Sequence, residues 1–326
     1  MEENKEVVEV EATEVKETEV VEETTDNGVS VVKSLDKIDE KRKKFWDIYS
    51  QQKKANNWVI IPAMIASILI FIILSNYYFI ALLLVGAILV GLFIYTNAVK
   101  KKVDALLQAY VKDYYTLFNG YTLDSKNITE MTYDQEEKLE KKEFADAGFI
   151  LDIHSTNSRN VVHGKWFGLK FKAADLVAKV LVSKKEEVCF LGKFFEIDAS
   201  EETEYKTVIY IKPHDDNGSG PNNIGGLDER KDLGLGEKIV VWSSDPQVKK
   251  IFTKKVITAL QAFDPNKDLV DVAISILRDK IYIALSYENG LLVLPSQEPL
   301  VRGPVEQYKS DVAKVDALLK ALTNQN

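Results

Sequence analysis

The side chains that could carry out chemistry in this 326-residue chain are few and widely separated. Its three histidines, His154, His163 and His214, have no spacing to one another or to a cysteine that is typical of a metal site. The single cysteine, Cys189, lies in the apolar run E-V-C-F-L, which favours a buried, inert thiol over a reactive nucleophile. The sequence therefore predicts no disulfide, no metal site and no catalytic cysteine.

A glycine-rich loop at residues 213–237 is the other candidate for chemistry, because backbone amides can hold a phosphate. Phosphate loops lead from a strand into a helix N-terminus, whereas this loop leads into an expected strand and carries several acidic residues that would repel an anion. The G-x-x-x-x-G-K-[ST] and G-x-S-x-G motifs are absent. We expect no cofactor and no catalytic residues. The alternative is an enzyme that gathers His163, Asp175 and Asp245 in one pocket.

Two apolar runs of about 17 residues each, between Trp58 and Tyr95, dominate the N-terminal third. Neither run contains Asp, Glu, Lys, Arg or His, and each is just long enough to cross a hydrocarbon core of roughly 30 Å. The polar, aromatic turn Ser75–Tyr78 between them is typical of a membrane interface. The pattern predicts a transmembrane helical hairpin at residues 57–97. Because the runs lack ionisable groups, it excludes a transporter or a channel.

Basic residues flank this hairpin on both outer sides, and the turn inside it carries no charge. Positive charge is retained in the cytoplasm, so we expect a multi-pass protein of the inner membrane with both termini cytoplasmic. The flanking residues are Lys43, Lys44, Lys53, Lys54, Lys100, Lys101 and Lys102.

Small residues recur at a spacing of four within the two runs, as Ala63 with Ser67 and Ala87 with Gly91. Such pairs let the backbones of membrane helices approach closely. The two pairs are expected to face each other across the hairpin or to face another subunit.

Composition divides the remainder of the chain. Residues 1–33 hold eleven acidic residues against three lysines, which is typical of a disordered acidic tail. Residues 34–56 are basic with apolar residues at helical spacing, which predicts an amphipathic juxtamembrane helix. An apolar stripe continues beyond the hairpin, so residues 98–147 are expected to form a helical stalk and connector, with its first helix ending near Asn119-Gly120 and a second helix at 134–147.

Residues 148–326 are expected to form a cytosolic α+β domain with a mostly antiparallel sheet and packed helices. The expected strands are 148–153, 165–172, 177–182, 188–197, 207–211, 238–242, 270–277, 280–287 and 291–294. Ser183–Glu186 is expected to connect two strands, and 270–277 is expected to pair with 280–287. Helices are expected after Ser244–Gln247 and over 305–322.

Several segments resemble the bacterial membrane family known as domain of unknown function 3137. They are F-A-D-A-G-F-I (144–150), F-L-G-K-F-F-E-I-D (190–198), W-S-S-D-P-Q-V-K-K-I-F-T (242–253) and I-S-I-L-R-D-K-I-Y-I-A-L (274–285), with the closing helix. His163 and Lys249-Lys250 depart from the family pattern. The resemblance implies two transmembrane helices followed by a cytosolic domain, and it implies no catalytic residues.

The leading functional hypothesis is a membrane-anchored cytosolic interaction or scaffold protein that is not an enzyme. Its partners would be the lipid bilayer and a protein partner or a second copy, and the near-neutral domain gives no sign of nucleic-acid binding. A candidate contact surface is the sheet edge near Phe190–Ile197 or the closing helix. Besides the enzyme, a lipid or envelope-stress sensor that uses the basic helix is the third reading.

Overall fold

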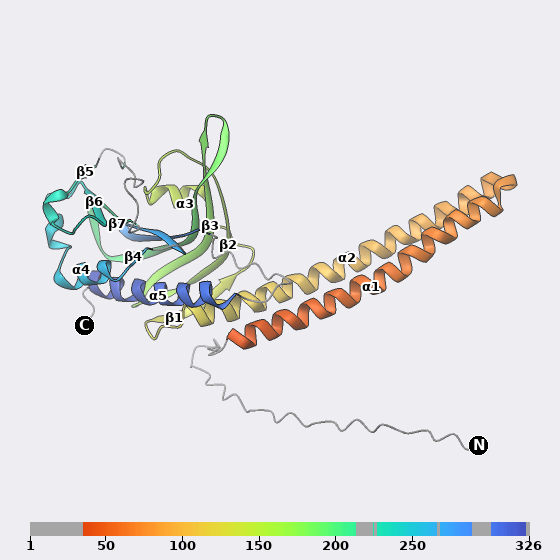
Figure 1. The fold of residues 1–326 in the computed structure, drawn as a ribbon, viewed down its shortest axis with the longest axis horizontal. Coiled ribbons are helices and arrows are strands. Elements are labelled where there is room, and N and C mark those ends of the chain that lie inside the picture. The colour runs from red at the N-terminus through yellow and green to blue at the C-terminus, as the bar shows by residue number, and fades with distance from the viewer. Residues whose placement is uncertain (1–34, 213–223, 225–226, 266–267, 289–300, 324–326) are drawn as a thin grey trace, which may run out of the picture.

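The computed structural model describes residues 35–212, 224, 227–265, 268–288 and 301–323. Two long helices, α1 (Leu35–Ile73) and α2 (Tyr78–Thr122), lie side by side and are joined by the short helix η1 (Ser75–Tyr77) (Figure 1). Both helices are long and apolar enough to cross a membrane by length and composition. The expected acidic tail lies outside the described residues.

Each long helix is continuous across boundaries that the sequence suggested. α1 passes through Pro62 without a break, so the basic segment 34–56 and the first apolar run belong to one helix. α2 extends three residues beyond Asn119 before it ends at Thr122. The expected helix at 134–147 is wrong in extent, because strand β1 (Ile128–Asp134) occupies its start and only α3 (Lys141–Asp146) is helical.

The remaining strands form an α+β unit with antiparallel pairing, as the sequence predicted, in the order β1-β2-β3-β4-β6-β5 with β7 on the other side of β4. Helices α4 and α5 complete it (Figure 1). The bounds are β2 (Ile153–Trp166), β3 (Leu169–Val182), β4 (Lys185–Ile211), β5 (Asp228–Glu229), β6 (Ile239–Ser243), α4 (Lys254–Gln261), β7 (Leu269–Tyr287) and α5 (Arg302–Leu322), with short helices η2 (Lys231–Leu233) and η3 (Val248–Lys250).

Two strands are much longer than expected. The predicted strands 188–197 and 207–211 are parts of β4, and 270–277 and 280–287 are parts of β7. The expected pairing within β7 is therefore wrong, since both of its halves pair with β4. Register shifts between Asp198 and Lys206, with Arg278 at a φ of 55°, bend the strands without ending them. The expected strand 291–294 lies outside the described residues.

Two-residue turns with positive φ connect the central hairpins. Ser183 and Lys184 join β3 to β4 within the segment that the sequence identified. Phe167 and Gly168 join β2 to β3, so the expected strand 165–172 is wrong because it spans this turn. His163 and Gly164 lie in β2 and not in a turn.

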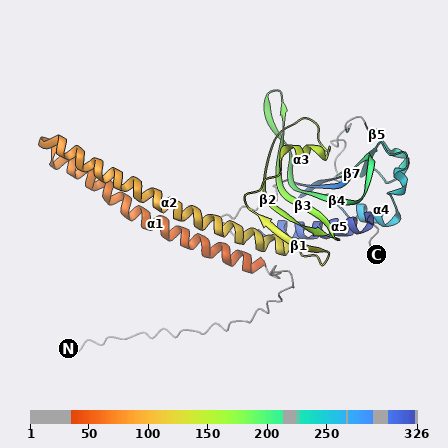
Figure 2. The ribbon, with the colours of Figure 1, turned by 180° about the vertical axis from the view of Figure 1, so that it is seen from behind.

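Two apolar cores lie on opposite faces of the sheet. Figure 2 shows the curvature of the sheet. The larger core lies between one face of the sheet and α2, α4 and α5. The smaller core lies on the opposite face, where Phe144 of α3 packs against Phe190 and Phe194. The end of α2 is thus an internal element of the larger core, with Tyr114, Phe118 and Asn119 at 1% exposure.

Candidate functional site: a buried polar link between α2 and the sheet

The two small-residue pairs lie on different sides of the long-helix pair. Ala63 is half-buried and Ser67 is buried between α1 and α2, where Ser67 Oγ donates a hydrogen bond to the Ala63 carbonyl. Ala87 and Gly91 are exposed on α2. The pairs therefore do not face each other, and of the two expected arrangements only an outward-facing role is open to Ala87 and Gly91.

The predicted membrane-flanking lysines are all exposed on the long helices. α1 and α2 run antiparallel, and the ion pair of Lys41 with Asp113 shows which residues of the two helices lie side by side. Counting along both helices from this pair places Lys53 and Lys54 opposite Lys100–Lys102. These five lysines form one basic collar at the end of the apolar runs.

The residues of the expected enzyme pocket do not come together. His163 contacts Glu137 on the face of the sheet that α3 covers, where Lys172 joins Glu137 to Glu143 of α3. Asp175 is buried on the opposite face, beneath α2 and α5. Asp245 follows β6, where its carboxylate accepts a hydrogen bond from the Gln247 amide.

Four buried polar side chains form a chain of hydrogen bonds from α2 across three strands. Asn119 of α2 and Asn160 of β2 exchange two amide hydrogen bonds, at 2.7 and 3.2 Å. Asn160 Nδ2 also donates to Asp175 Oδ2 of β3 at 3.0 Å. Lys193 Nζ of β4 donates to Asp175 Oδ1 at 3.0 Å. All four residues are at most 2% exposed, and we call them the buried polar link.

Local structure explains how the sequence places these groups. Asp175 and Lys193 are register partners on adjacent antiparallel strands, so their side chains leave the same face. Asn160 lies within a bulge of β2, at a φ of 55°, a conformation that asparagine tolerates better than most residues. The bulge turns its amide toward α2.

Burying the charges of Asp175 and Lys193 costs free energy. Removing an ion pair from water costs several kcal/mol per ion unless the remaining polar sites are filled. Here the Asn160 amide satisfies Asp175, and the ring of Tyr308 on α5 lies 5.8 Å from Lys193 Nζ. Burial, followed by the charge of Asp175, raises the pKa of Tyr115 and of Tyr308 above the usual range, so both hydroxyls stay neutral beside it.

A series of aromatic contacts connects α1 to the same place. Phe45 of α1 stacks on Tyr110 of α2 at 4.2 Å between centroids. The series continues along α2 from Tyr114 to Phe118, which stacks on Tyr308 of α5 at 6.2 Å. The helix pair thus contacts the region around Lys193 through continuous packing.

Two further carboxylates hold α5 against this assembly. Asp311 is fully buried and accepts hydrogen bonds from Tyr287 of β7 and from Gln307 and Lys314. Asp316 accepts hydrogen bonds from Trp166, Ser125 and Asn127, which joins α5 to the end of β2 and to the segment after α2. α2, α5 and the sheet are therefore fastened together by polar contacts as well as by the core.

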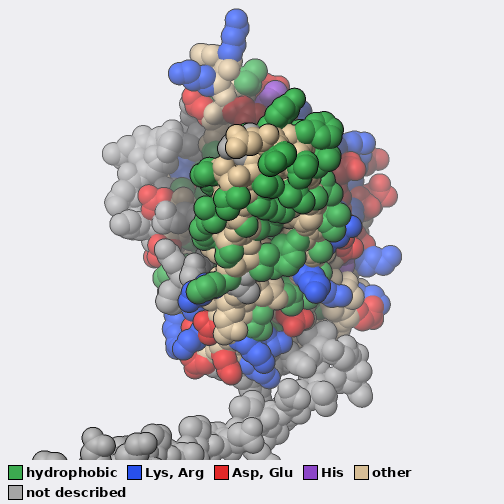
Figure 3. Space-filling model, turned by 90° about the vertical axis from the view of Figure 1, so that its right-hand side faces the viewer, with side chains coloured by type: hydrophobic (Ala, Val, Ile, Leu, Met, Phe, Trp, Pro, Cys, Tyr) green, Lys and Arg blue, Asp and Glu red, His purple; other side chains and the backbone are tan. Residues whose placement is uncertain are grey.

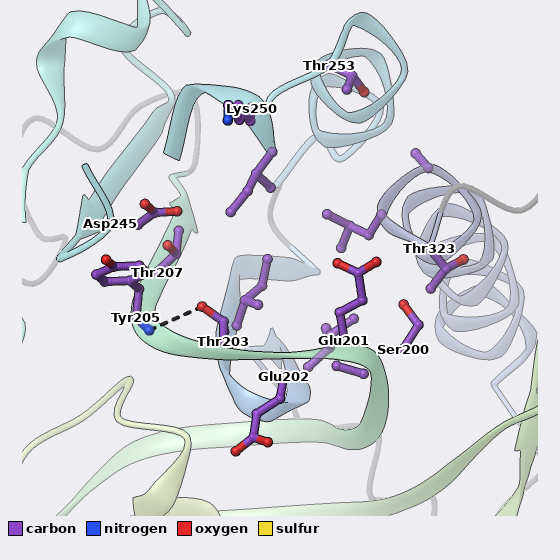
Figure 4. A pocket seen from close by; sticks show the side chains of 16 residues that line it. Ser200, Glu201, Glu202, Thr203, Tyr205, Thr207, Asp245, Lys250, Thr253 and Thr323 are labelled. Carbon is purple, nitrogen blue, oxygen red and sulfur yellow. Dashed lines mark hydrogen bonds between the residues drawn. The ribbon is translucent and has the colours of Figure 1, made fainter. Parts of the chain in front are cut away.

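A hollow of about 630 Å³ lies elsewhere, between the bend of β4, η3 and the end of α5. Figure 4 shows Glu201 pointing into it, with Asp245 and Lys250 on its far wall. Its lining contains no histidine or cysteine. Among the described residues, no group of three or more His, Cys, Asp or Glu could hold a metal ion.

The sequence did not identify Asn119, Asn160 and Lys193 as site residues. It grouped Asp175 with His163 and Asp245, which do not lie near it. A signal was present, because Asp175 and Lys193 each stand inside an otherwise apolar strand, A-A-D-L-V-A and F-L-G-K-F-F. Charged residues in apolar strands are buried only when they are paired. Choosing the partner required the strand register.

Comparison with known proteins identifies no family. No protein-family model matches the sequence. No curated protein matches it either. Among solved structures, the crystal structure of the mycobacterial trehalose monomycolate transport factor A is similar at a TM-score of 0.34 and 11% identity, covering 66% of this chain and 96% of that one. A similarity this low carries no inference about function.

Proposed function

We propose that the protein is a membrane-anchored interaction or scaffold protein rather than an enzyme. In this proposal α1 and α2 cross the inner membrane as a hairpin, and the α+β unit lies in the cytosol on a rigid helical stalk. A protein partner, or a second copy, would bind the displayed unit. The resemblance to the family of domain of unknown function 3137 belongs to the same proposal.

The dimensions of the hairpin support the membrane placement. Tyr78 and Tyr95 are separated by about 26 Å along α2 at 1.5 Å per residue, close to the roughly 30 Å of a hydrocarbon core. Trp58, Tyr77 and Tyr78 are 66–80% exposed at the two ends of this span, where aromatic residues accumulate in membrane proteins. Figure 3 looks at the hairpin end-on and shows a surface covered by hydrophobic side chains.

The continuity of α2 favours a scaffold. α2 is a single 45-residue helix with an exposed apolar first half, and its last turns are buried in the larger core and bonded through Asn119 to the buried polar link. Such a helix fixes the orientation of the unit relative to the bilayer. A fixed orientation suits a protein that presents a binding surface at a set distance from the membrane.

The segment Phe190–Ile197, expected from the sequence to lie at a sheet edge, is for the most part not at an edge. Residues 192–197 pair with β3 on one side and β7 on the other, so they are in the middle of the sheet. The closing helix keeps an outward face, where Ser310, Ala313 and Ala317 are exposed. We therefore assign partner binding to the outer face of α5.

Partner binding can be tested by photocrosslinking in the native cell. A photoreactive amino acid at Ala313 or Ala317 should give one crosslinked species at fixed stoichiometry, either with another protein or with a second copy. The matched control is the same group at Lys165, an exposed position on β2. Repeated failure to crosslink from α5, or an identical pattern from Lys165, would count against the proposal.

Lipid sensing is a second candidate, because the lysines of the basic collar are exposed at the height of the expected membrane surface. Each lysine near an anionic surface contributes about 1 kcal/mol, screened by salt. The full chain in nanodiscs should then shift its stability with anionic lipid at low salt only. Salt-insensitive behaviour would remove this reading.

A further inference from the structure

A second cavity lies on the face of the sheet opposite the buried polar link. It measures about 400 Å³, within the range of roughly 300–1,000 Å³ typical of small-molecule pockets. Most of the side chains that line it are apolar, and they come from α3, the segment after it, β4, β7 and Ile224. They include Phe144, Phe149, Phe190, Val208, Ala273 and Ala284.

The apolar surface continues to the rim of this cavity. Leu151, which lines it, is 54% exposed. A large apolar side chain that is exposed at the edge of a pocket can form part of a binding site. An apolar entrance would let an apolar molecule reach the cavity without crossing a polar barrier.

One cation stands beside the wall of the cavity. Lys206 precedes Val208 by two residues on β4, so their side chains leave the same face. Lys206 Nζ also donates to the Gly148 carbonyl at 3.3 Å, next to Phe149. Within the described part of the chain, no carboxylate forms an ion pair with Lys206, and burial lowers the pKa of its ammonium group.

The acid in the cavity is at the other end. Asp271 lines the wall six residues along β7 from Leu277, the register partner of Lys206, a separation of about 20 Å. The cavity thus has mainly apolar side chains in its lining, with Lys206 beside one end and Asp271, which has a partner of its own, in the wall at the other. This is the complement of an anionic amphiphile with a single chain.

We propose that this cavity binds a long-chain fatty acid, with the acyl chain among the aromatic side chains and the carboxylate paired with Lys206. The size favours one acyl chain over a peptide. Lys206 has no carboxylate partner among the described residues, whereas Asp271 has a partner of its own, so the charge left without a counter-ion favours a fatty acid over a fatty amine or a neutral alcohol. The proposal is independent of what binds to α5.

Modification of Cys189 reports on binding inside the cavity and not on fatty acid that dissolves in the bilayer. Cys189 is the only cysteine in the chain and lines the cavity. In the full chain held in nanodiscs, palmitate below its micellar concentration should slow modification of Cys189 by N-ethylmaleimide several-fold, in a saturable way. An unchanged or faster rate would overturn the proposal.

Variants and a second ligand distinguish the contribution of the carboxylate to binding from that of the acyl chain. Lys206→Gln should raise the half-protecting palmitate concentration by about tenfold, the loss expected for a charge-assisted hydrogen bond. Lys165→Gln, at an exposed ion pair, should leave it unchanged. Hexadecanol should protect the native chain only at concentrations similar to those needed for the Lys206→Gln variant. Equal protection by alcohol and acid would refute the assigned carboxylate contact.

A filled cavity provides the last control. Ala273→Trp places a large side chain in the lining, and should abolish protection by palmitate. If this variant does not fold, as judged by circular dichroism, Leu151→Trp at the exposed rim replaces it. Protection that persists in a folded filled variant would overturn the proposal.

Discussion

At the scale of single residues, the sharpest feature is a fully buried lysine–aspartate pair that is completed by two asparagines. Such a pair adds little stability compared with a well-packed apolar pair, but breaking it leaves an uncompensated buried charge. Lys193 and Asp175 therefore constrain which strands and helices can meet, and Asn119 extends that constraint to α2.

Removing one partner of the pair should be costly. Lys193→Met is expected to lower the free energy of unfolding by about 3–5 kcal/mol, and the double variant Lys193→Met/Asp175→Leu should recover most of it. Lys165→Met, at the exposed pair with Glu130, should cost at most about 1 kcal/mol. Thermal unfolding of the full chain in detergent micelles measures all three. A Lys193→Met variant as stable as Lys165→Met would contradict the role given to the pair.

Gly192 is required by a close backbone approach. A Cβ atom there would lie 1.9 Å from the Leu285 carbonyl oxygen of β7, so Gly192→Ala should destabilise the chain by at least about 1–3 kcal/mol. Gly303 of α5 has open space around it, and Gly303→Ala should be neutral or stabilising. The same melting experiment checks both; equal effects would show that the strands can separate at Gly192.

Buried tyrosines predict a loss of stability in alkali. Burial raises the pKa of Tyr133 and of Tyr282 to about 12, above the value of about 10 in an unfolded chain. Because the folded state favours the neutral hydroxyl, their contribution is present below pH 10 and is lost as the pH rises from about 10 toward 12. The melting temperature should fall over this window, and less steeply in Tyr282→Phe. A flat profile between pH 9.5 and 11.5 would be the contrary result.

At the scale of elements, the sequence predicted the helices and turns that depend on neighbouring residues alone. Two uncharged apolar runs predicted long helices, and Ser183–Glu186 predicted a tight connection between strands. The lengths of β4 and β7 could not be predicted, because bulged strands continue through residues such as Arg278 that otherwise read as turns. The buried polar link was missed for a related reason: its members are far apart in sequence and meet only through strand register.

The continuity of α2 gives a prediction of its own. Ala105 is exposed in the stretch between the apolar run and the buried end of the helix. Ala105→Pro should kink or break the helix there, at a cost of about 3 kcal/mol, whereas Ala105→Leu should not. Spin labels at Ala98 and Lys141, in a Cys189→Ser background, should give a narrow distance distribution that broadens or shifts only with proline. An already broad distribution in the unmodified helix would contradict a rigid stalk.

At the scale of the whole molecule, the positions of the charged residues, the apolar runs and the packed helix ends are consistent with one axis. The basic collar, the aromatic residues at both ends of the span and the buried end of α2 all follow the axis of the helix pair. In the proposed function, that axis is the membrane normal, and the α+β unit is held away from the bilayer in a fixed orientation.

The most direct test of this arrangement is a topology measurement in intact cells. Single cysteines at Asn76, between the long helices, and at Lys165, on the sheet, are introduced into the Cys189→Ser chain and treated with a membrane-impermeant maleimide. We predict that Asn76→Cys reacts in intact cells and that Lys165→Cys reacts only after the membrane is opened. Reaction of Lys165→Cys in intact cells, or recovery of the chain without membranes, would contradict the account.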